Sequence, residues 1–145
     1  MPTDPHHLDR FITAQDEIYS SALNELRVGC KQGHWMWFIF PQIDGLGHSQ
    51  VARSYAIRSL NEAAAYLSNP VLGARLIECC EALLLHPDRS AHEILGSPDD
   101  MKLRSCVTLF AQIHPTHPVF EKILSTFYSA CPDLRTIEKL RTLDA

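Results

Sequence analysis

Residues that favour the N-cap of a helix are followed directly by proline at three places in this chain. The pairs are Asp4-Pro5, Asn69-Pro70 and Ser97-Pro98. A side-chain oxygen at the N-cap accepts a hydrogen bond from a backbone N–H of the first helical turn. Proline fits the first helical position because it has no N–H to leave unpaired. Each pair therefore predicts a helix start, and a chain that repeats the signal is expected to be mainly helical.

Further helix starts lie between these pairs. Ser49 and Ser59 are placed as N-caps, and Ser90 with Glu93 has the spacing of a capping box. No run of alternating residues bounded by turn signals predicts a sheet. We therefore predict an all-α fold of about eight or nine short helices. The first is expected from Pro5 to Gly29, and further helices from Ser49 to Ile57 and at 60–67. One helix is opened by Asn69-Pro70 and ends before Pro87, one runs from Ser90 to Gly96, and one is started by Ser97-Pro98 and includes Ala111. The last two are expected at 120–128 and 133–140, with a buried helical turn or a strand at 34–40.

The composition is that of one globular domain. The chain has 145 residues, of which 46% are hydrophobic and 21% charged, and this length supports a core without disulfides. We expect a single helical domain over residues 1–145, with its core at about 5–141 and loose ends at Met1–Thr3 and Thr142–Ala145. The polar N-terminus does not resemble a signal peptide, and the longest apolar run, Trp35–Phe40, is too short to span a membrane.

The cysteines indicate a reducing compartment. Their number is odd, no Cys-x-x-Cys pair is among them, and they are Cys30, Cys79, Cys80, Cys106 and Cys131. This pattern favours free thiols, which are typical of the cytoplasm. The formal net charge of −4 gives the chain no overall attraction for nucleic acid or for anionic membranes. We therefore expect a cytoplasmic protein that binds neither of them.

Motifs of cofactor and metal chemistry are absent from the sequence. It contains no phosphate-binding P-loop, no dinucleotide-binding glycine motif and no nucleophile elbow. Eight histidines are present, but none forms the metal motif His-Glu-x-x-His. His114 and His117 flank Pro115, which keeps them off one continuous helix face. We predict no metal site and no cofactor.

One segment is unusually aromatic. Both tryptophans, Trp35 and Trp37, lie within three residues of each other and are flanked by Lys31, His34 and Gln42. Aromatic faces with polar groups at their edges suit a ligand pocket, because an indole ring stacks on flat or cationic groups. The alternative is that this is the central core segment and that its aromatic residues are there for burial.

Two further segments have residues suited to a ligand. In the first, a glycine-rich loop leads through Ser49 to a helix with Arg53 in its first turn, which is an arrangement that favours an anion. The alternative is a loop followed by an ordinary serine cap. In the second, Asp99, Lys102 and Ser105 would line a cleft, with a carboxylate as general base and the lysine holding an anionic group. The alternative is an ordinary helix start in which acidic residues favour the helix dipole.

Several strings of the sequence also match a known family. They are His34–Gln42 (HWMWFIFPQ), Gly45-Leu46-Gly47-x-Ser49, Tyr55-Ala56-Ile57, Asn69-Pro70-Val71-Leu72-Gly73-x-Arg75-Leu76, and Asp99-Asp100-x-Lys102-Leu103-x-Ser105-x-x-Thr108-Leu109-Phe110. From about Phe11 to Leu140, the chain resembles the bacterial domain-of-unknown-function family 1810.

The resemblance implies an all-α fold, a right-handed, armadillo-like superhelix of short helices, and no established activity. Members of the family are sometimes called calpastatin. That label is unsupported here, because a calpain inhibitor is largely disordered and repetitive whereas this chain has the pattern of a compact helical domain. Members also often have Ser at the position of Cys106, which argues against this residue as a nucleophile.

Three functions follow from these observations. The first is a small binding module for an anionic or aromatic small molecule, or for a peptide or protein in the concave face of the superhelix. The second is an enzyme for a phosphate-bearing or nucleotide-like substrate, with His34 or Asp100 as acid or base and with Lys31, Arg53 and Lys102 holding charge. The third is a structural, oligomeric role, although the sequence does not determine an oligomeric state.

The first two functions share a geometric expectation. The side chains of the three segments would surround one concave, partly aromatic pocket. The residues expected around it are Trp35, Gln42, Ser49, Arg53, Asp100 and Lys102.

Overall fold

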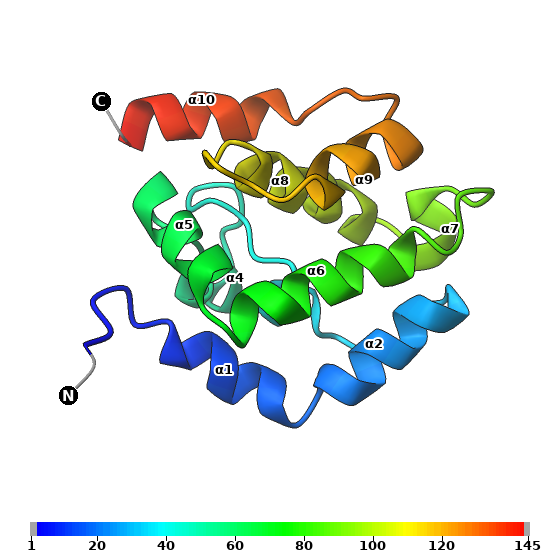
Figure 1. Cartoon of the computed structure of the whole chain (residues 1–145), viewed down its shortest axis with the longest axis horizontal. Helices are drawn as coiled ribbons and strands as arrows, with labels where there is room; N and C mark the ends of the chain where they lie inside the picture. The colour runs from blue at the N-terminus through cyan, green and yellow to red at the C-terminus, as the bar shows by residue number, and fades with distance from the viewer. Residues whose placement is uncertain (1–2, 144–145) are drawn as a thin grey trace.

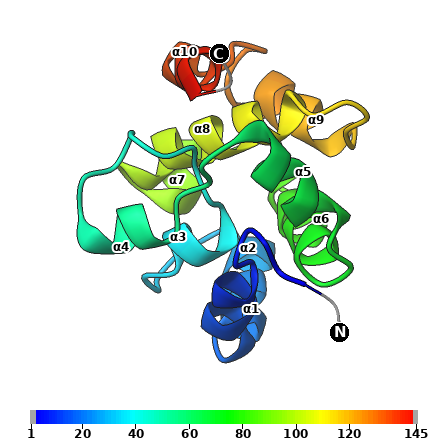
Figure 2. The same ribbon diagram turned by 90° about the vertical axis from the view of Figure 1, so that its left-hand side faces the viewer.

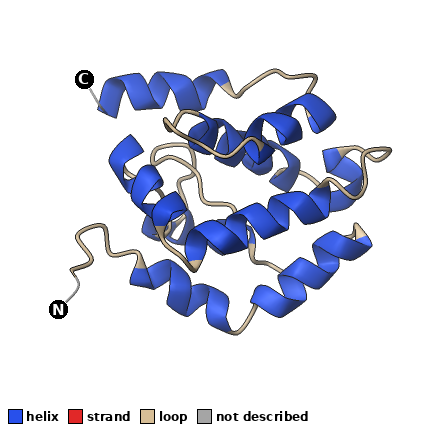
Figure 3. Ribbon diagram, in the orientation of Figure 1, coloured by secondary structure: helices blue, strands red, loops and turns tan. Residues whose placement is uncertain are grey.

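The computed structural model describes residues 3–143, and within this range it contains ten α-helices and no strand (Figure 1, Figure 3). The all-α prediction is confirmed, although eight or nine helices were expected. The helices are α1 (Asp9–Asp16), α2 (Tyr19–Val28), α3 (Met36–Ile39), α4 (Gln50–Ser54), α5 (Leu60–Ser68), α6 (Leu72–Leu83), α7 (Ala91–Leu95), α8 (Asp99–Ala111), α9 (Val119–Phe127) and α10 (Leu134–Leu143). The predicted loose ends lie partly outside the described residues.

The first predicted helix is two helices, which is one correction to the sequence analysis. The chain leaves α1 at Glu17 and enters α2 after Ile18. The break lets the two halves pack on different neighbours, since α1 contacts α3 whereas α2 contacts α6. A straight helix over the same residues would extend past the small core. The predicted stop at Gly29 is confirmed, because this glycine has a left-handed φ of 87° at the end of α2.

Asp4 forms a cap, but for a helix that starts later than predicted. Its carboxylate accepts hydrogen bonds from the N–H groups of Leu8 and Asp9 at 2.8 and 2.9 Å. These two bonds hold the pKa of the Asp4 carboxyl below its ordinary value. A turn over residues 5–8 separates Pro5 from α1, so proline is not the first helical residue here.

The other cap predictions are largely confirmed. Ser49, Ser59 and Ser90 each accept a hydrogen bond from a backbone N–H in the first turn of α4, α5 and α7, and Ser90 completes a capping box. Asn69 accepts from two N–H groups at the start of α6. The exception is Ser97, because Pro98 occupies the N-cap position of α8 and no side-chain cap bond forms.

The aromatic segment forms the short helix α3, which resolves the choice between a helical turn and a strand in favour of the helix. The predicted loop at 42–48 is present. Its backbone pairs with the chain beyond α4, because Ile57 N–H donates to Gln42 and Asp44 N–H donates to Ile57, both at 2.8 Å. This pairing draws residues 55–57 away from the helix, so α4 ends at Ser54 and not at Ile57.

The helices stack in layers around one apolar core. In Figure 1, α1 and α2 lie below α5 and α6, and α8 and α9 lie between these and α10. Figure 2 shows α3 and α4 on the side of the molecule opposite α5 and α6. A series of aromatic contacts links the layers through Phe11, Tyr66, Phe110 and Phe120, with ring centroids 5.1–5.6 Å apart. The right-handed superhelix stays a prediction.

No helix within residues 3–143 is long and apolar enough to cross a membrane.

The five cysteines divide into two classes of accessibility. Cys79, Cys80 and Cys106 are fully buried, whereas Cys30 and Cys131 are exposed and none is in a disulfide. Burial raises the pKa of Cys79 to about 12 and those of Cys80 and Cys106 well above the ordinary 9.0, which leaves them as unreactive thiols.

We expect a thiol reagent to modify two cysteines in the native protein and five after denaturation without reductant. The physical reason is that a reagent reaches Cys30 and Cys131 directly but reaches the other three only when the core opens. Mass spectrometry of the labelled protein measures both counts. A count of one or three after denaturation would show disulfides, and rapid native labelling of Cys106 would contradict its burial.

Candidate functional site

Two of the three predicted site segments meet around the carboxylate of Asp99. The Lys31 ammonium lies 2.8 Å from one Asp99 oxygen, and the Lys102 ammonium lies 3.6 Å from the other. Lys31 comes from the aromatic segment and Lys102 from the first turn of α8. The ion pairs therefore bring these two segments together.

Both lysines also pack against tryptophan. Lys31 lies over the Trp35 ring at 5.0 Å from its centroid, and Lys102 lies over the Trp37 ring at 4.8 Å. Such contacts are cation–π interactions. We name Lys31, Trp35, Trp37, Asp99 and Lys102 the Asp99 cluster.

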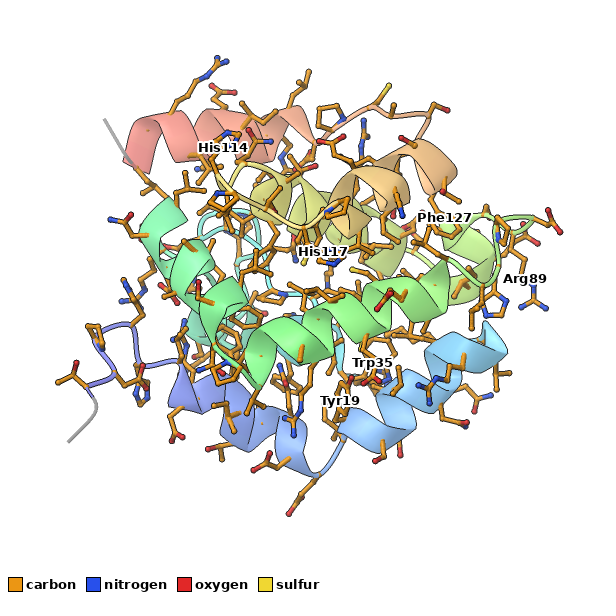
Figure 4. The ribbon with its side chains drawn as sticks, viewed as in Figure 1. Tyr19, Trp35, Arg89, His114, His117 and Phe127 are labelled. Atoms are coloured by element: carbon orange, nitrogen blue, oxygen red, sulfur yellow. The ribbon has the colours of Figure 1, made fainter. Side chains whose placement is uncertain are left out.

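Trp35 is fixed from its other edge by a carboxylate of α2. Figure 4 shows this ring close to α2, where its indole N–H donates to Glu25 at 2.9 Å. The same oxygen of Glu25 accepts from the backbone N–H groups of Gln32 and Gly33 at 2.8 and 2.9 Å. Burial alone raises the pKa of Glu25, but these hydrogen bonds outweigh it and leave the pKa below the ordinary 4.5.

Replacing Glu25 with Gln is expected to lower the free energy of unfolding by about 1 kcal/mol near neutral pH, after allowance for partial exposure. Because the folded pKa is depressed, the stabilisation is fully present above pH 4.5 and is lost as the pH falls through the folded value. Wild type and variant should therefore converge in acid. Urea unfolding followed by tryptophan fluorescence measures the difference, and a gap that persists in acid would contradict this assignment.

The charged groups of the Asp99 cluster pair with one another and with the backbone. The Lys31 side chain is only 8% exposed, and it also donates to the Gly33 carbonyl at 2.5 Å. Asp99 is shared by two ammonium groups. Charged groups that already pair within the protein have few free donors or acceptors for a ligand. We therefore assign the cluster a structural role, in which it joins the aromatic segment to α8 and stabilises the fold.

The glycine loop contributes little space next to this cluster. Trp37, Gln42, Gly45 and Gly47 line a hollow of only about 10 Å³, which is smaller than a ligand needs. Ser49 is the N-cap of α4. The hypothesis of one pocket shared by all three segments stays a prediction: an ion pair joins the first segment to the third, and the small hollow lies between the first and the second.

The other candidate residues have separate surroundings. His34 is exposed, and its side chain forms no hydrogen bond or ion pair within residues 3–143. Asp100 lies 3.6 Å from exposed His92, and its backbone carbonyl accepts the Tyr128 hydroxyl. Ser105 is buried and donates to Asp133 at 2.9 Å. No contact among the described residues joins His34 to Asp100, the two candidate acid–base groups.

A larger pocket lies elsewhere, between the N-terminal segment, α4 and α5. It has a volume of about 560 Å³, within the usual range for small-molecule sites. Figure 1 shows the N-terminal segment, α4 and α5 on the same side of the molecule. We name it the α1–α5 pocket. Its polar lining includes His6, His7, Arg10, Tyr55, Arg58 and Glu62.

Arg10 holds the walls of this pocket together. Its guanidinium has five N–H groups, and five hydrogen bonds are formed. They reach three parts of the chain at 2.7–2.9 Å. The acceptors are the carbonyls of His6, His7, Ser54 and Ala56 and the carboxylate of Glu62.

The carboxylate of Glu62 lies at the base of the same network. Its side chain is 4% exposed and forms an ion pair with Arg10 at 2.8 Å, while its other oxygen accepts from the Arg58 N–H at 3.1 Å. The N-terminal wall is also constrained, because His7 has a left-handed φ of 52° while its carbonyl accepts from Arg10. The pocket is therefore preorganised without a ligand.

The arginines at the rim have no such partners. Arg58 and Arg53 are both exposed, and neither forms an ion pair within residues 3–143. Arg58 lines the α1–α5 pocket, and Arg53 lines an adjoining hollow. The single carboxylate in the pocket lining is neutralised by Arg10, so the remaining charge there is positive and suits an anion.

No residue that lines this pocket was predicted as a site residue, although the predicted Arg53 lines the adjoining hollow. Ser59 and Glu62 have capping-box spacing, which offers a local explanation for the glutamate. In the structure its oxygen accepts from Arg58 and not from Ser59. Arg10 could have indicated the network, because it directly precedes the core residue Phe11. A charged side chain next to a buried helix face requires a hydrogen-bonding or charged partner.

The described residues include no group of three or more His, Cys, Asp or Glu side chains placed to hold a metal ion. His117 instead accepts a hydrogen bond from the Val119 N–H at the start of α9.

Comparison with known proteins gives a family but no activity. The conserved hypothetical protein Rv1873 from Mycobacterium tuberculosis, known from a crystal structure, is 47% identical to this chain, with a TM-score of 0.92 over 95% of this chain and 99% of that one. No curated protein matches. The family model described as "Protein of unknown function (DUF1810)" matches residues 5–140. The chain therefore belongs to the DUF1810 family, as its aromatic string and loop motifs indicated.

Proposed function

We propose that this protein is a binding module without catalysis, and that its ligand is a small anionic molecule held in the α1–α5 pocket. The observation that carries the proposal is the position of Arg58, an arginine without an acidic partner, at a preorganised pocket of about 560 Å³. A binding site of this kind is concave, largely preformed and supplied with a few polar groups that fix the ligand.

The lining of the pocket supports an anion over a cation. Glu62 is the carboxylate in that lining, and Arg10 compensates its charge at 2.8 Å. His6 and His7 add ring nitrogens that can donate hydrogen bonds, and Tyr55 adds an aromatic ring and a hydroxyl. An anion that entered would meet uncompensated donors but no uncompensated carboxylate.

The Asp99 cluster is a less favourable anion site than the α1–α5 pocket. Lys31 and Lys102, which the sequence suggested as anion binders, both face Asp99. An anion there would have to displace a carboxylate from an ion pair of 2.8 Å. At the α1–α5 pocket it would displace only water from Arg58.

A cytoplasmic location belongs to this proposal. The five cysteines are unpaired in the structure, and three of them are buried thiols. This state is expected in a reducing compartment, where small phosphorylated and carboxylated metabolites are available as ligands.

Replacing Arg58 with Gln is expected to weaken binding of inorganic phosphate about tenfold or more, because a charge-assisted hydrogen bond is lost. The melting temperature should hardly change, since Arg58 is exposed and unpaired. Isothermal titration calorimetry measures the affinity. Arg135→Gln is the matched control, because Arg135 is also exposed and forms no ion pair within the described residues. Equal phosphate affinity in the Arg58 and Arg135 variants would refute the proposal.

A further inference from the structure

The surface next to the α1–α5 pocket contains a second hollow. Its volume is about 540 Å³, and it is lined by Gln50, Arg53, Ser54 and Arg58. Ser54 and Arg58 also line the α1–α5 pocket. The two hollows therefore adjoin, and Arg58 lies at their junction.

The charge of the second hollow is entirely positive. Its charged lining residues are Arg53 and Arg58, and no carboxylate is among them. Three other arginines are compensated by carboxylates, since Arg10 pairs with Glu62, Arg27 approaches Glu78 and Arg75 approaches Asp16. Two uncompensated guanidinium groups beside one hollow repel each other unless an anion lies between them.

The backbone that carries both arginines is held in place. Arg10 donates to the carbonyls of Ser54 and Ala56 at 2.9 Å, and the Arg58 N–H donates to buried Glu62. Between them, Ile57 pairs with the loop at Gln42. The two guanidinium groups therefore extend from a fixed segment, so little backbone entropy is lost when a ligand binds both.

We infer that the ligand carries two adjacent anionic groups, as a small diphosphate ester does, and that these groups contact Arg58 and Arg53 while the rest of the ligand occupies the α1–α5 pocket. This inference rests on the proposed function and adds the class of ligand. An anion with one charged group in the α1–α5 pocket contacts Arg58 but not Arg53, because Arg53 does not line that pocket. A diphosphate can contact Arg58 with one group and Arg53 with the other, because Arg58 belongs to both hollows.

The amide of Gln50 and the hydroxyl of Ser54 complete the second hollow. Both groups can donate hydrogen bonds to phosphate oxygens. Arginine suits this task because its planar fork binds two oxygens of one phosphate at once.

The test compares inorganic phosphate with pyrophosphate by isothermal titration calorimetry on the full chain. Wild type is expected to bind pyrophosphate about tenfold or more tightly than phosphate. Arg53→Gln should remove most of this preference and leave phosphate affinity within about twofold of wild type. Arg135→Gln, which lowers the total charge equally, should keep the preference.

The outcomes separate this inference from the proposed function. The diphosphate inference is overturned if wild type binds the two anions equally, or if Arg53→Gln weakens the affinity for both anions by the same factor. Phosphate binding at Arg58 stands in either case. If Arg135→Gln loses the preference for pyrophosphate as much as Arg53→Gln does, the preference reflects general electrostatic attraction, and the diphosphate inference is overturned. Binding of neither anion overturns both proposals.

Discussion

Replacing Arg10 with Met is expected to lower the free energy of unfolding by about 3–5 kcal/mol, the range observed when one partner of a buried ion pair is removed. The Glu62 side chain is 4% exposed and would lose its cation while staying buried. Four backbone carbonyls would lose a donor at the same time. Equilibrium urea unfolding measures the change.

The double variant Arg10→Met, Glu62→Leu separates the two losses. Replacing both charges with apolar side chains removes the unpaired carboxylate, so a large part of the stability should return. Recovery should be incomplete, because the carbonyls of Ser54 and Ala56 still lack the guanidinium. Arg135→Met, at an exposed position, should change stability by less than about 0.5 kcal/mol. A loss in Arg10→Met as small as that control would contradict the assigned role.

Replacing Gly73 with Ala is expected to destabilise the protein by about 3 kcal/mol, at the upper end of the usual range for overpacking. Gly73 lies in the first turn of α6, where an added Cβ would be 2.0 Å from the Leu67 carbonyl oxygen and 2.9 Å from its carbon. Both atoms belong to the backbone of α5, so the contact can be relieved only by moving one helix against the other. Thermal and urea unfolding measure the loss.

The direction of this effect is informative because helix propensity predicts the reverse. Within a helix, alanine is favoured over glycine by about 1 kcal/mol. Ala74→Gly, at the exposed neighbouring position, should follow propensity and destabilise by about that amount. A Gly73→Ala protein as stable as wild type would show that α5 and α6 do not approach as closely as described.

Local signals accounted for most of the fold. Ser49, Ser59 and Ser90 cap helices because the hydrogen bond joins residues three positions apart, and such spacing is visible in a sequence. The break between α1 and α2 was missed because no glycine or proline marks it. It depends on packing against α3 and α6, which are distant in the chain.

The candidate site was predictable only in part. Lys31 and Lys102 were both predicted as site residues, and in the structure both lie next to Asp99. The residue types alone do not reveal that the two lysines form ion pairs with Asp99. Likewise, Arg10 and Glu62 are 52 positions apart, so no local pattern links them. Arg53 was suggested as an anion-binding residue, and it lines one hollow together with Arg58, which is five positions further along the chain.

The central claim is that an anion binds at the α1–α5 pocket and not at the Asp99 cluster. Titration of isotope-labelled protein with inorganic phosphate, followed by the NMR signals of the backbone amides, tests it most directly. We predict saturable shifts concentrated at residues 6–10 and 54–59, two stretches that contain most of the residues lining the pocket. Shifts concentrated instead at residues 31–37 and 99–105 would place the anion at the Asp99 cluster and contradict the claim, as would no saturable shifts at either place.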